Sequence, residues 1–346
     1  MKKLSALFIC VLLSATFLTA YAKEQDKRTP FMTRTFPASS IKEVEATTSG
    51  GSLALTGDAG SQATVEVYVS RDNWSNDQIK KYLDENYTLD IKVVSGKLYA
   101  TAKQKTSFNN WNNQGLSISF KISVPKQVNS NLQTSGGSIQ ISALSGSQNF
   151  VTSGGSLAVD NVSGNTVGAT SGGSISLSNS NDNIDLKTSG GSISAKDCNG
   201  TISLATSGGS LSLNNLSGNI NAATSGGSVS ANNINGTLIT GTSGGSMNLD
   251  GISGNVKAST SGGNMSVKVK SVTDYVKLSN SGSINLTLPA GKGFNLDVKA
   301  SKVESSMKES GAFRGEWKTD SFAGTINNGG PEINVRSSQR VWLSFE

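Results

Sequence analysis

The chain has 346 residues, of which 35% are hydrophobic and 6% aromatic, and its formal net charge is +6 without a single histidine. Histidine is the commonest general base and metal ligand, so its absence excludes most hydrolytic triads and zinc sites, and we expect no cofactor and no metal. Lysine and arginine are dispersed rather than clustered, so the positive charge indicates a solvated surface and no nucleic-acid binding.

Residues 1–22 have the pattern of a secretory signal peptide. Two lysines precede an apolar stretch at residues 4–18, and Ala20-Tyr21-Ala22 offers a small-residue cleavage site. The apolar stretch is shorter than the ~20 residues of a spanning helix, so we expect no transmembrane span after cleavage. We predict an exported chain that begins near Lys23 and lies in the periplasm, at the cell surface or outside the cell. Cys198 is then its one cysteine, which excludes an intramolecular disulfide.

Residues 23–133 are predicted to form a capping module of β-strands with one short helix. Residues 49–55 resemble an early copy of the repeat that follows, and Ile79, Leu83 and Tyr87 recur at four-residue spacing behind Asp77. This spacing predicts a short amphipathic helix at residues 76–87. Strands are expected at residues 64–70, 89–94, 97–102 and 116–124, with an asparagine-rich loop at residues 108–115.

Eight copies of an 18-residue unit follow at residues 134–269. Each begins Thr-Ser-Gly-Gly-Ser, except the last, which begins Thr-Ser-Gly-Gly-Asn. A strict short period with glycine at fixed offsets is typical of a solenoid. In the unit that begins at Thr206, the apolar residues form two period-2 pairs nine residues apart, which indicates two short strands per coil. These apolar residues are Leu211, Leu213, Leu216, Ile220 and Ala222.

The two corners of the predicted coil both contain residues that tolerate a positive φ. One corner has the Gly-Gly pair, and the other has glycine or aspartate three residues after an asparagine or aspartate. We therefore predict tight turns with positive φ at both corners. The nine-plus-nine spacing favours a flattened, two-sided coil over a three-sided hexapeptide helix. One interior column begins with polar Gln148 and Thr166, which we interpret as the place where the N-terminal segment packs.

Residues 270–346 are predicted to continue as irregular coils and a cap. Strands are expected at residues 284–288, 294–298, 324–327, 332–336 and 341–345. The sequence therefore predicts an all-β protein, a single-stranded β-solenoid (β-helix) of 18-residue coils with two short strands each. A solenoid exposes sheet edges at its ends, so the flanking modules are expected to cap them.

Several segments resemble a known family of exported β-strand-repeat proteins, named "putative adhesins". The resemblance implies a single β-helix that is exported to the cell envelope or surface, in a family of unknown function that is named for adhesion. The family brings no established catalytic motif, so it assigns no active-site residue to this chain. The similar segments are Phe36-Pro37 followed by residues 41–45, residues 48–57, 64–67 and 122–125, the Thr-Ser-Gly-Gly-Ser coils, and residues 286–289 and 329–336.

The densest charge of the repeat lies at Asp182, Asp185, Lys187, Lys196 and Asp197, on adjacent coils. Asp182 and Asp185 are candidate ligand-binding residues. Paired carboxylates can also perform acid and base steps on a glycan, so one interpretation is a catalytic cluster. The other is that Asp182 and Asp197 occupy turn positions that glycine and asparagine hold in other coils. The Gly-Gly units also resemble calcium-binding β-roll repeats, but they supply no aspartate ligands, so no calcium site is expected.

Two further features are candidates for ligand binding. Aromatic residues concentrate in the N-terminal module, where Trp111, between asparagines, and Trp74 are the candidate ligand-binding residues because aromatic rings stack on sugars and anchor interfaces. Two ranks of outward hydroxyls form either a flat face for a repetitive ligand or a small polar surface without a ligand. The ranks are Ser138, Ser156, Ser174, Ser192, Ser210, Ser228 and Ser246, and Ser176, Ser194, Ser212 and Ser230.

Together these features predict an exported cell-envelope or surface protein that binds a glycan or a cell-surface protein and is not an enzyme. A carbohydrate-active β-helix enzyme, either a polysaccharide lyase or a hydrolase acting at residues 182–197, is one alternative. An envelope scaffolding protein is another. The sequence indicates no particular oligomeric state.

Overall fold

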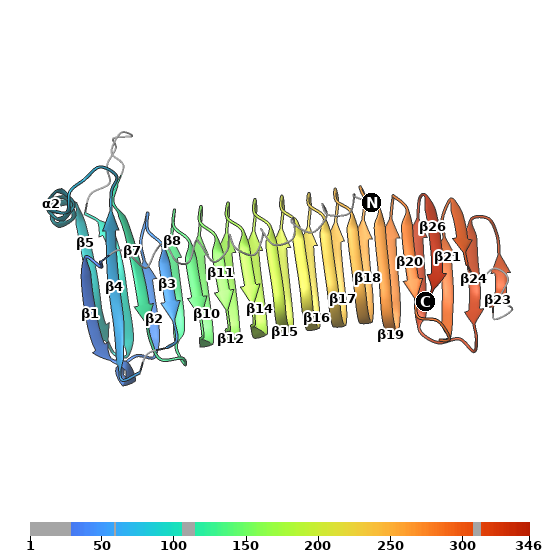
Figure 1. Cartoon of the computed structure of the whole chain (residues 1–346), viewed down its shortest axis with the longest axis horizontal. Helices are drawn as coiled ribbons and strands as arrows, with labels where there is room; N and C mark the ends of the chain where they lie inside the picture. The colour runs from blue at the N-terminus through green and yellow to red at the C-terminus, as the bar shows by residue number, and fades with distance from the viewer. Residues whose placement is uncertain (1–28, 59, 106–114, 307–312) are drawn as a thin grey trace, which may run out of the picture.

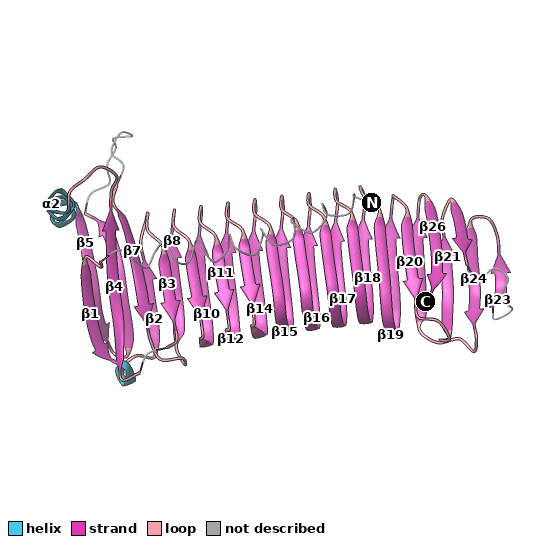
Figure 2. Cartoon of the chain, viewed as in Figure 1, coloured by secondary structure: helices cyan, strands magenta, loops and turns pink. Residues whose placement is uncertain are grey.

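The computed structural model describes residues 29–58, 60–105, 115–306 and 313–346. Strands stack into one elongated β-solenoid, with helix α2 (Asn76–Asn86) at one end and strand β23 (Phe313–Trp317) at the other (Figures 1 and 2). The predicted fold class is confirmed. Within the described ranges, no helix is both long and apolar enough to cross a membrane. The predicted signal peptide at residues 1–22 lies outside the described residues.

Each coil of the repeat contributes one strand segment to each of two faces, called face A and face B, and neighbouring coils pair in parallel within each face. Residues pair with those one period later, as in Leu211 with Val229. Early coils have separate strands, whereas from Ile193 onward one strand continues from face A through the corner into face B. Face A begins with β9 (Ile139–Ser142), β11 (Leu157–Asp160) and β13 (Ile175–Ser178), and face B with β8 (Asn129–Thr134), β10 (Ser145–Thr152), β12 (Ser163–Thr170) and β14 (Asn181–Thr188). The continuous strands are β15 (Ile193–Thr206), β16 (Leu211–Thr224), β17 (Val229–Thr242), β18 (Met247–Thr260) and β19 (Met265–Asn280).

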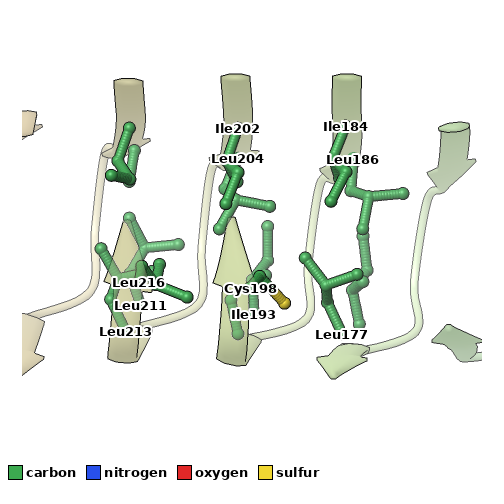
Figure 3. Close-up of a cluster of buried hydrophobic side chains, with 14 of the residues drawn as sticks. Leu177, Ile184, Leu186, Ile193, Cys198, Ile202, Leu204, Leu211, Leu213 and Leu216 are labelled. Atoms are coloured by element: carbon green, nitrogen blue, oxygen red, sulfur yellow. The ribbon is translucent and has the colours of Figure 1, made fainter. Parts of the chain in front are cut away.

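The interior between the two faces is a continuous apolar column (Figure 3). Leu211 and Leu213 of face A and Ile220 of face B are each no more than 1% exposed, as the period-2 pattern predicts. Burial of each such side chain stabilises the fold by roughly 1.5–3 kcal/mol. At the first coil, Gln148 is fully buried, and its side-chain amide bonds Ser130 and the carbonyl oxygen of Val128. Gln148 is thus bonded to the coil before the repeat, whereas the buried Thr166 Oγ1 in the next coil has no hydrogen-bond partner among the described residues.

The Gly-Gly corner differs from its prediction, because none of the paired glycines in the repeat has a positive φ. The second glycine of each pair is required for a different reason. A Cβ on Gly209 would lie 2.1 Å from the carbonyl oxygen of Gly191 in the preceding coil, whereas a Cβ on Gly208 would have 3.4 Å to its nearest neighbour. The predicted positive φ is therefore wrong at this corner, where close coil-to-coil approach selects glycine.

The threonine that opens each unit forms a hydrogen-bond ladder at the same corner. Thr206 Oγ1 donates to the carbonyl oxygen of Gly191 at 2.7 Å and accepts from the backbone N–H of Gly209 at 3.2 Å. The same donation links Thr134 to Gly51 in the first coil, and Asn280 takes over the role beyond the last repeat. The Thr-Ser-Gly-Gly motif is therefore explained by stacking between coils.

The opposite corner confirms the predicted positive φ. Asn215 has a φ of 54° and Gly218 a φ of 105°, and the equivalent positions in neighbouring coils are similar. Asp182 and Asp197, with φ values of 76° and 55°, occupy such positions in their own coils. Asparagine, aspartate and glycine tolerate this conformation best, so the corner selects them.

At the N-terminal end, the order of strands in space departs from their order in sequence. The coil of β2 (Glu43–Thr47) and β3 (Leu53–Thr56) lies between the repeat and the later strands β6 (Lys97–Gln104) and β7 (Ser117–Ser123). Antiparallel strands β4 (Gln62–Ser70), β5 (Tyr87–Val94) and β1 (Met32–Pro37) complete this end, and a 3-10 turn, η2 (Ala38–Ser40), follows β1. The coil of β2 and β3 therefore lies inside this end, with strands of other coils on both sides of it.

The C-terminal end has the same feature. β25 (Glu332–Ser337) lies between β19 and β21 (Phe294–Lys299), and β26 (Arg340–Phe345) lies between β20 (Ile284–Leu288) and β22 (Lys302–Ser305). An antiparallel hairpin of β24 (Ser321–Ile326) and β23 closes the end. The last coil in sequence is thus inserted between two earlier ones (Figure 1). The sequence pattern did not predict β1, β2, β8, β22 or β23.

Candidate functional site

The carboxylates of the predicted cluster do not contact one another, and each of them bonds a different neighbouring group. Asp182 Oδ2 accepts the backbone N–H of Gly164 in the preceding coil at 2.9 Å, and so supports the turn. Asp185 lies on the outer surface of face B, where its carboxylate pairs with Lys187 at 2.9 Å. Each carboxylate thus has a partner for one of its oxygens within the protein, while Asp185 Oδ1 is buried without a hydrogen-bond partner among the described residues.

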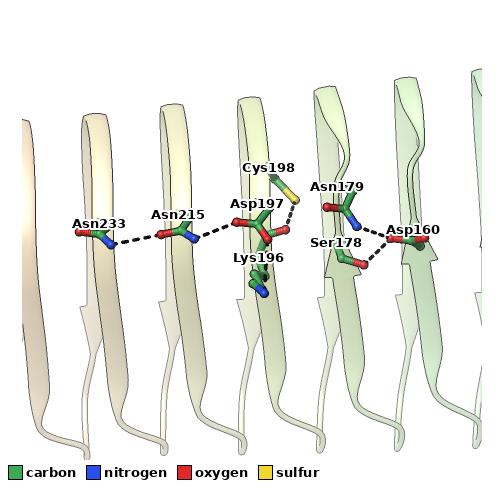
Figure 4. A network of polar contacts seen from close by, with 8 residues as sticks. All are labelled: Asp160, Ser178, Asn179, Lys196, Asp197, Cys198, Asn215 and Asn233. Atoms are coloured by element: carbon green, nitrogen blue, oxygen red, sulfur yellow. Dashed lines mark hydrogen bonds and ion pairs between the residues drawn. The ribbon is translucent and has the colours of Figure 1, made fainter. Parts of the chain in front are cut away.

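Asp197 is the acceptor at the end of a ladder of amide side chains (Figure 4). Lys270 Nζ donates to Asn233 Oδ1, Asn233 Nδ2 to Asn215 Oδ1, and Asn215 Nδ2 to Asp197 Oδ1 at 2.8 Å. The hydrogen bond from Asn215, with a contribution from Lys196, lowers the pKa of Asp197 below its usual range. This environment favours a structural carboxylate that is ionised near neutral pH rather than a proton donor.

A glycosidase needs two carboxyl groups that face one bond of the substrate from a defined separation. Here Asp182 and Asp197 lie at exposed turns, and no contact joins either of them to Asp185. Among the residues that the structure describes, no group of three histidine, cysteine, aspartate or glutamate side chains is arranged to hold a metal ion. Asp182 and Asp197 therefore belong to turns, and Asp185 belongs to the outer surface of face B.

The structure describes one of the two aromatic candidates of the N-terminal module, Trp74. Trp111 lies outside the described residues. Trp74 is half-buried beside α2, with the guanidinium carbon of Arg71 3.8 Å from its ring centroid and Tyr82 packed edge-on at 5.2 Å. These intramolecular contacts occupy much of its ring, as expected for a residue that anchors the helix.

The serine rank that opens each coil on face A takes part in coil stacking. Ser192 Oγ accepts the backbone N–H of Ser210 at 3.1 Å, and Ser210 Oγ accepts that of Ser228 at 3.2 Å. Each of these hydroxyls retains one donor hydrogen for solvent or a ligand. The rank is therefore first a structural feature and second a polar surface.

The second serine rank continues further along face A than the repeat itself. Its members pair in strand register with no gap as far as Trp342 on β26, which lies next to Glu304 on β22. The sequence interpretation did not select Trp342. The alternation Val341-Trp342-Leu343 carries the signal, because a strand that buries Val341 and Leu343 must direct the ring outward. The rank is Ser176, Ser194, Ser212, Ser230, Asn248, Ser266, Asn285 and Trp342.

Charged groups surround the Trp342 ring. Glu304 accepts a hydrogen bond from Lys302 at 2.6 Å and lies 3.9 Å from Arg340. Lys302 first, and Arg340 in addition, lower the pKa of Glu304, so its carboxylate is ionised and able to accept hydrogen bonds. Arg340 is on the same strand as Trp342 and on the same outer face.

Part of the chain matches a known protein family. Residues 175–339 match the family described as Toastrack DUF4097. This part of the chain is similar to the proteins of that family. It includes the carboxylates of residues 182–197 and most of the inserted C-terminal coil, while Trp342 lies just beyond the matched residues. No curated protein matches the chain.

Solved structures that are similar to most of this chain include the following three. A "putative cell adhesion protein" from Clostridium sporogenes is 10% identical, with 92% of this chain and 100% of that chain covered and a TM-score of 0.20. A "putative adhesin" from Bacteroides fragilis is 12% identical, with 91% and 96% covered and a TM-score of 0.22. A "putative lipid binding protein" from Parabacteroides distasonis is 15% identical, with 91% and 96% covered and a TM-score of 0.31. At these identities and scores, the similarities assign no function to this chain.

Proposed function

We propose that this protein is an exported, non-catalytic rod of the cell envelope or surface that binds a glycan or a cell-surface protein through its outer faces. The observation that carries the proposal is the unbroken register of outward polar side chains along face A, from Ser176 to Asn285. Such a surface offers the same hydrogen-bonding groups at every coil, about 4.8 Å apart. A repetitive ligand could contact several coils at once.

Rigidity supports binding by such a face. The interior is packed without interruption, and the threonine ladder fixes each coil against the one before it. A preorganised surface loses little conformational entropy on binding, and several weak contacts along one rod add in avidity. The structural roles of Asp182, Asp185 and Asp197 favour binding over catalysis.

Export and binding can be tested on the full-length protein. We expect the mature chain from a bacterial host to begin near Lys23 by mass spectrometry, and added protease to digest it on intact or outer-permeabilised cells. Binding would be measured on an array of immobilised oligosaccharides and on intact cells. A cytoplasmic, uncleaved chain, or one that binds neither the array nor cells, would contradict the proposal.

Catalysis is tested separately with the Asp182→Asn/Asp185→Asn double variant. We expect this variant to bind as the wild type does, and neither protein to release reducing sugar or unsaturated product from polysaccharides. Product release by the wild type that the double variant loses would instead establish the carbohydrate-active enzyme.

A further inference from the structure

We propose that Trp342 forms the centre of a glycan-binding platform at the C-terminal end of face A. The indole ring stacks on the apolar face of a sugar ring, while Asn285, Arg340 and Glu304 bond the sugar hydroxyls. This inference rests on the proposed binding function, for which it names the ligand class and the place.

The first argument is the exposure of the ring. Trp342 is 42% exposed, and it is the only tryptophan in the exposed class among the described residues. Its strand neighbours Val341 and Leu343 are fully buried, so the backbone holds the ring on the outside. A large aromatic surface left in water by a rigid strand is available to a partner at little conformational cost.

The second argument is the set of polar groups around the ring. Asn285 is exposed on the strand to one side, and Glu304 lies on the strand to the other. Arg340 supplies several N–H donors, the ionised Glu304 supplies acceptors, and the Asn285 amide supplies both. Sugar hydroxyls donate and accept hydrogen bonds, so this mixture suits a glycan better than a ligand with one kind of polar group.

The third argument is the space beside the ring. An open hollow of about 730 Å³ is lined by Trp342 together with Lys302, Glu304, Trp317 and Lys318, among other residues. Ligand sites in proteins have volumes of roughly 300–1,000 Å³, so the hollow is large enough for a short oligosaccharide. The row of hydroxyl and amide groups from Ser176 to Asn285 then extends the platform along the rod for a longer chain.

The charges argue for a glycan over a membrane. Lys302 and Arg340 both lie within 4 Å of Glu304, and Lys318 pairs with Glu316 at 2.8 Å, so two carboxylates offset most of the charge of these three basic groups. An anionic lipid surface would favour an unbalanced basic cluster. Trp342 also has polar rather than apolar neighbours on its own face, which does not match an insertion into hydrocarbon.

The experiment uses the full-length protein and three soluble hexasaccharides, of glucose, N-acetylglucosamine and galacturonic acid. Affinity would be measured by calorimetry and by the change in tryptophan fluorescence. We expect at least one hexasaccharide to bind the wild type, Trp342→Ala to bind it about tenfold more weakly, and Trp342→Phe to recover most of the affinity. Trp74→Phe is the matched control, since it changes a half-buried tryptophan at the other end of the rod. Thermal unfolding would show that all variants are folded.

The possible outcomes separate this inference from the proposed function. Equal affinity of wild type and Trp342→Ala for a bound hexasaccharide overturns the platform but leaves glycan binding intact. If no hexasaccharide binds the wild type, this result also contradicts the proposed platform at Trp342. The proposed function then depends on whether the wild type still binds intact cells, as it would through a protein partner.

Discussion

The repeat and the two ends of the rod stack their coils in different ways. In the repeat, each coil pairs with the coils before and after it in sequence, as β16 does with β15 and β17. At both ends, a terminal coil lies between strands that are distant in sequence, as β25 does between β19 and β21. A terminal coil of a uniform solenoid would have one unpaired edge, which invites fraying and aggregation. The insertion gives the first and last coils two partners each, so the ends depend on long-range contacts and the repeat on local ones.

The largest effect is expected from a change inside the inserted coil. Ile333 is fully buried and pairs with both Val276 of β19 and Leu296 of β21. We expect Ile333→Ala to lower the free energy of unfolding by about 2–5 kcal/mol and to raise hydrogen exchange across β21 to β24. The reason is that β21 and β22 contact the remaining rod through this coil.

The control for this prediction is Leu213→Ala in the middle of the repeat. Leu213 is also fully buried, but its strand partners are Ala195 and Ala231 in the adjacent coils. Its exchange effect should remain within a few coils of the substitution. If Ile333→Ala leaves the exchange of residues 294–305 unchanged, the end is not held by the inserted coil.

A second substitution tests why the repeat contains two glycines. We expect Gly209→Ala to destabilise the protein by about 3 kcal/mol, because the new Cβ would meet the carbonyl oxygen of Gly191 and separate the two coils. Gly208→Ala has room for its Cβ and should change the unfolding midpoint little. Comparable midpoints for the two variants would show that backbone conformation, and not coil spacing, selects glycine there.

These glycines also show what the sequence could and could not predict. The interior columns follow from the 18-residue period, since each inward residue such as Leu211 implies its successor, Val229. Positive φ at Asn215 and Asp197 follows from the preferences of single residues. The Gly-Gly pair was wrongly explained in the same way, because the reason for Gly209 lies in the neighbouring coil. A contact between coils is not encoded in the preference of any one residue.

The ends were less predictable because the order in sequence no longer gives the order in space. Alternation along Val341-Trp342-Leu343 is enough to place Trp342 outside. Its neighbours Asn285 and Glu304 follow only once β26 is known to lie between β20 and β22. Sequential stacking would instead have brought Glu304 next to Asn285. The candidate platform is therefore a product of the insertion.

A smaller effect is expected from the threonine ladder of the repeat. Thr206→Val keeps the shape of the side chain but removes the donor to the carbonyl oxygen of Gly191. We expect a loss of about 1–2 kcal/mol in the free energy of unfolding, the cost of one unsatisfied backbone group. Ser207→Ala, at the exposed next position, serves as the control in the same denaturant titration. A loss no greater than that of the control would mean that the ladder is not a source of stability.

The smallest effect concerns pH and the amide ladder at the opposite corner. The pKa of Asp197 is lowered in the folded state, chiefly by the hydrogen bond from Asn215, so the ionised form stabilises the fold. This contribution is fully present above the pKa of the unfolded chain and is lost as the pH falls through the lower folded value.

In thermal melts from about pH 6 to about pH 2, the advantage of the wild type over Asp197→Asn should therefore disappear toward acid. In an Asn215→Ala background, the same comparison should show a smaller advantage at every pH, because the main donor is gone. An advantage that persists unchanged at the acid end would mean that the ionised form of Asp197 is not the source of the difference from asparagine.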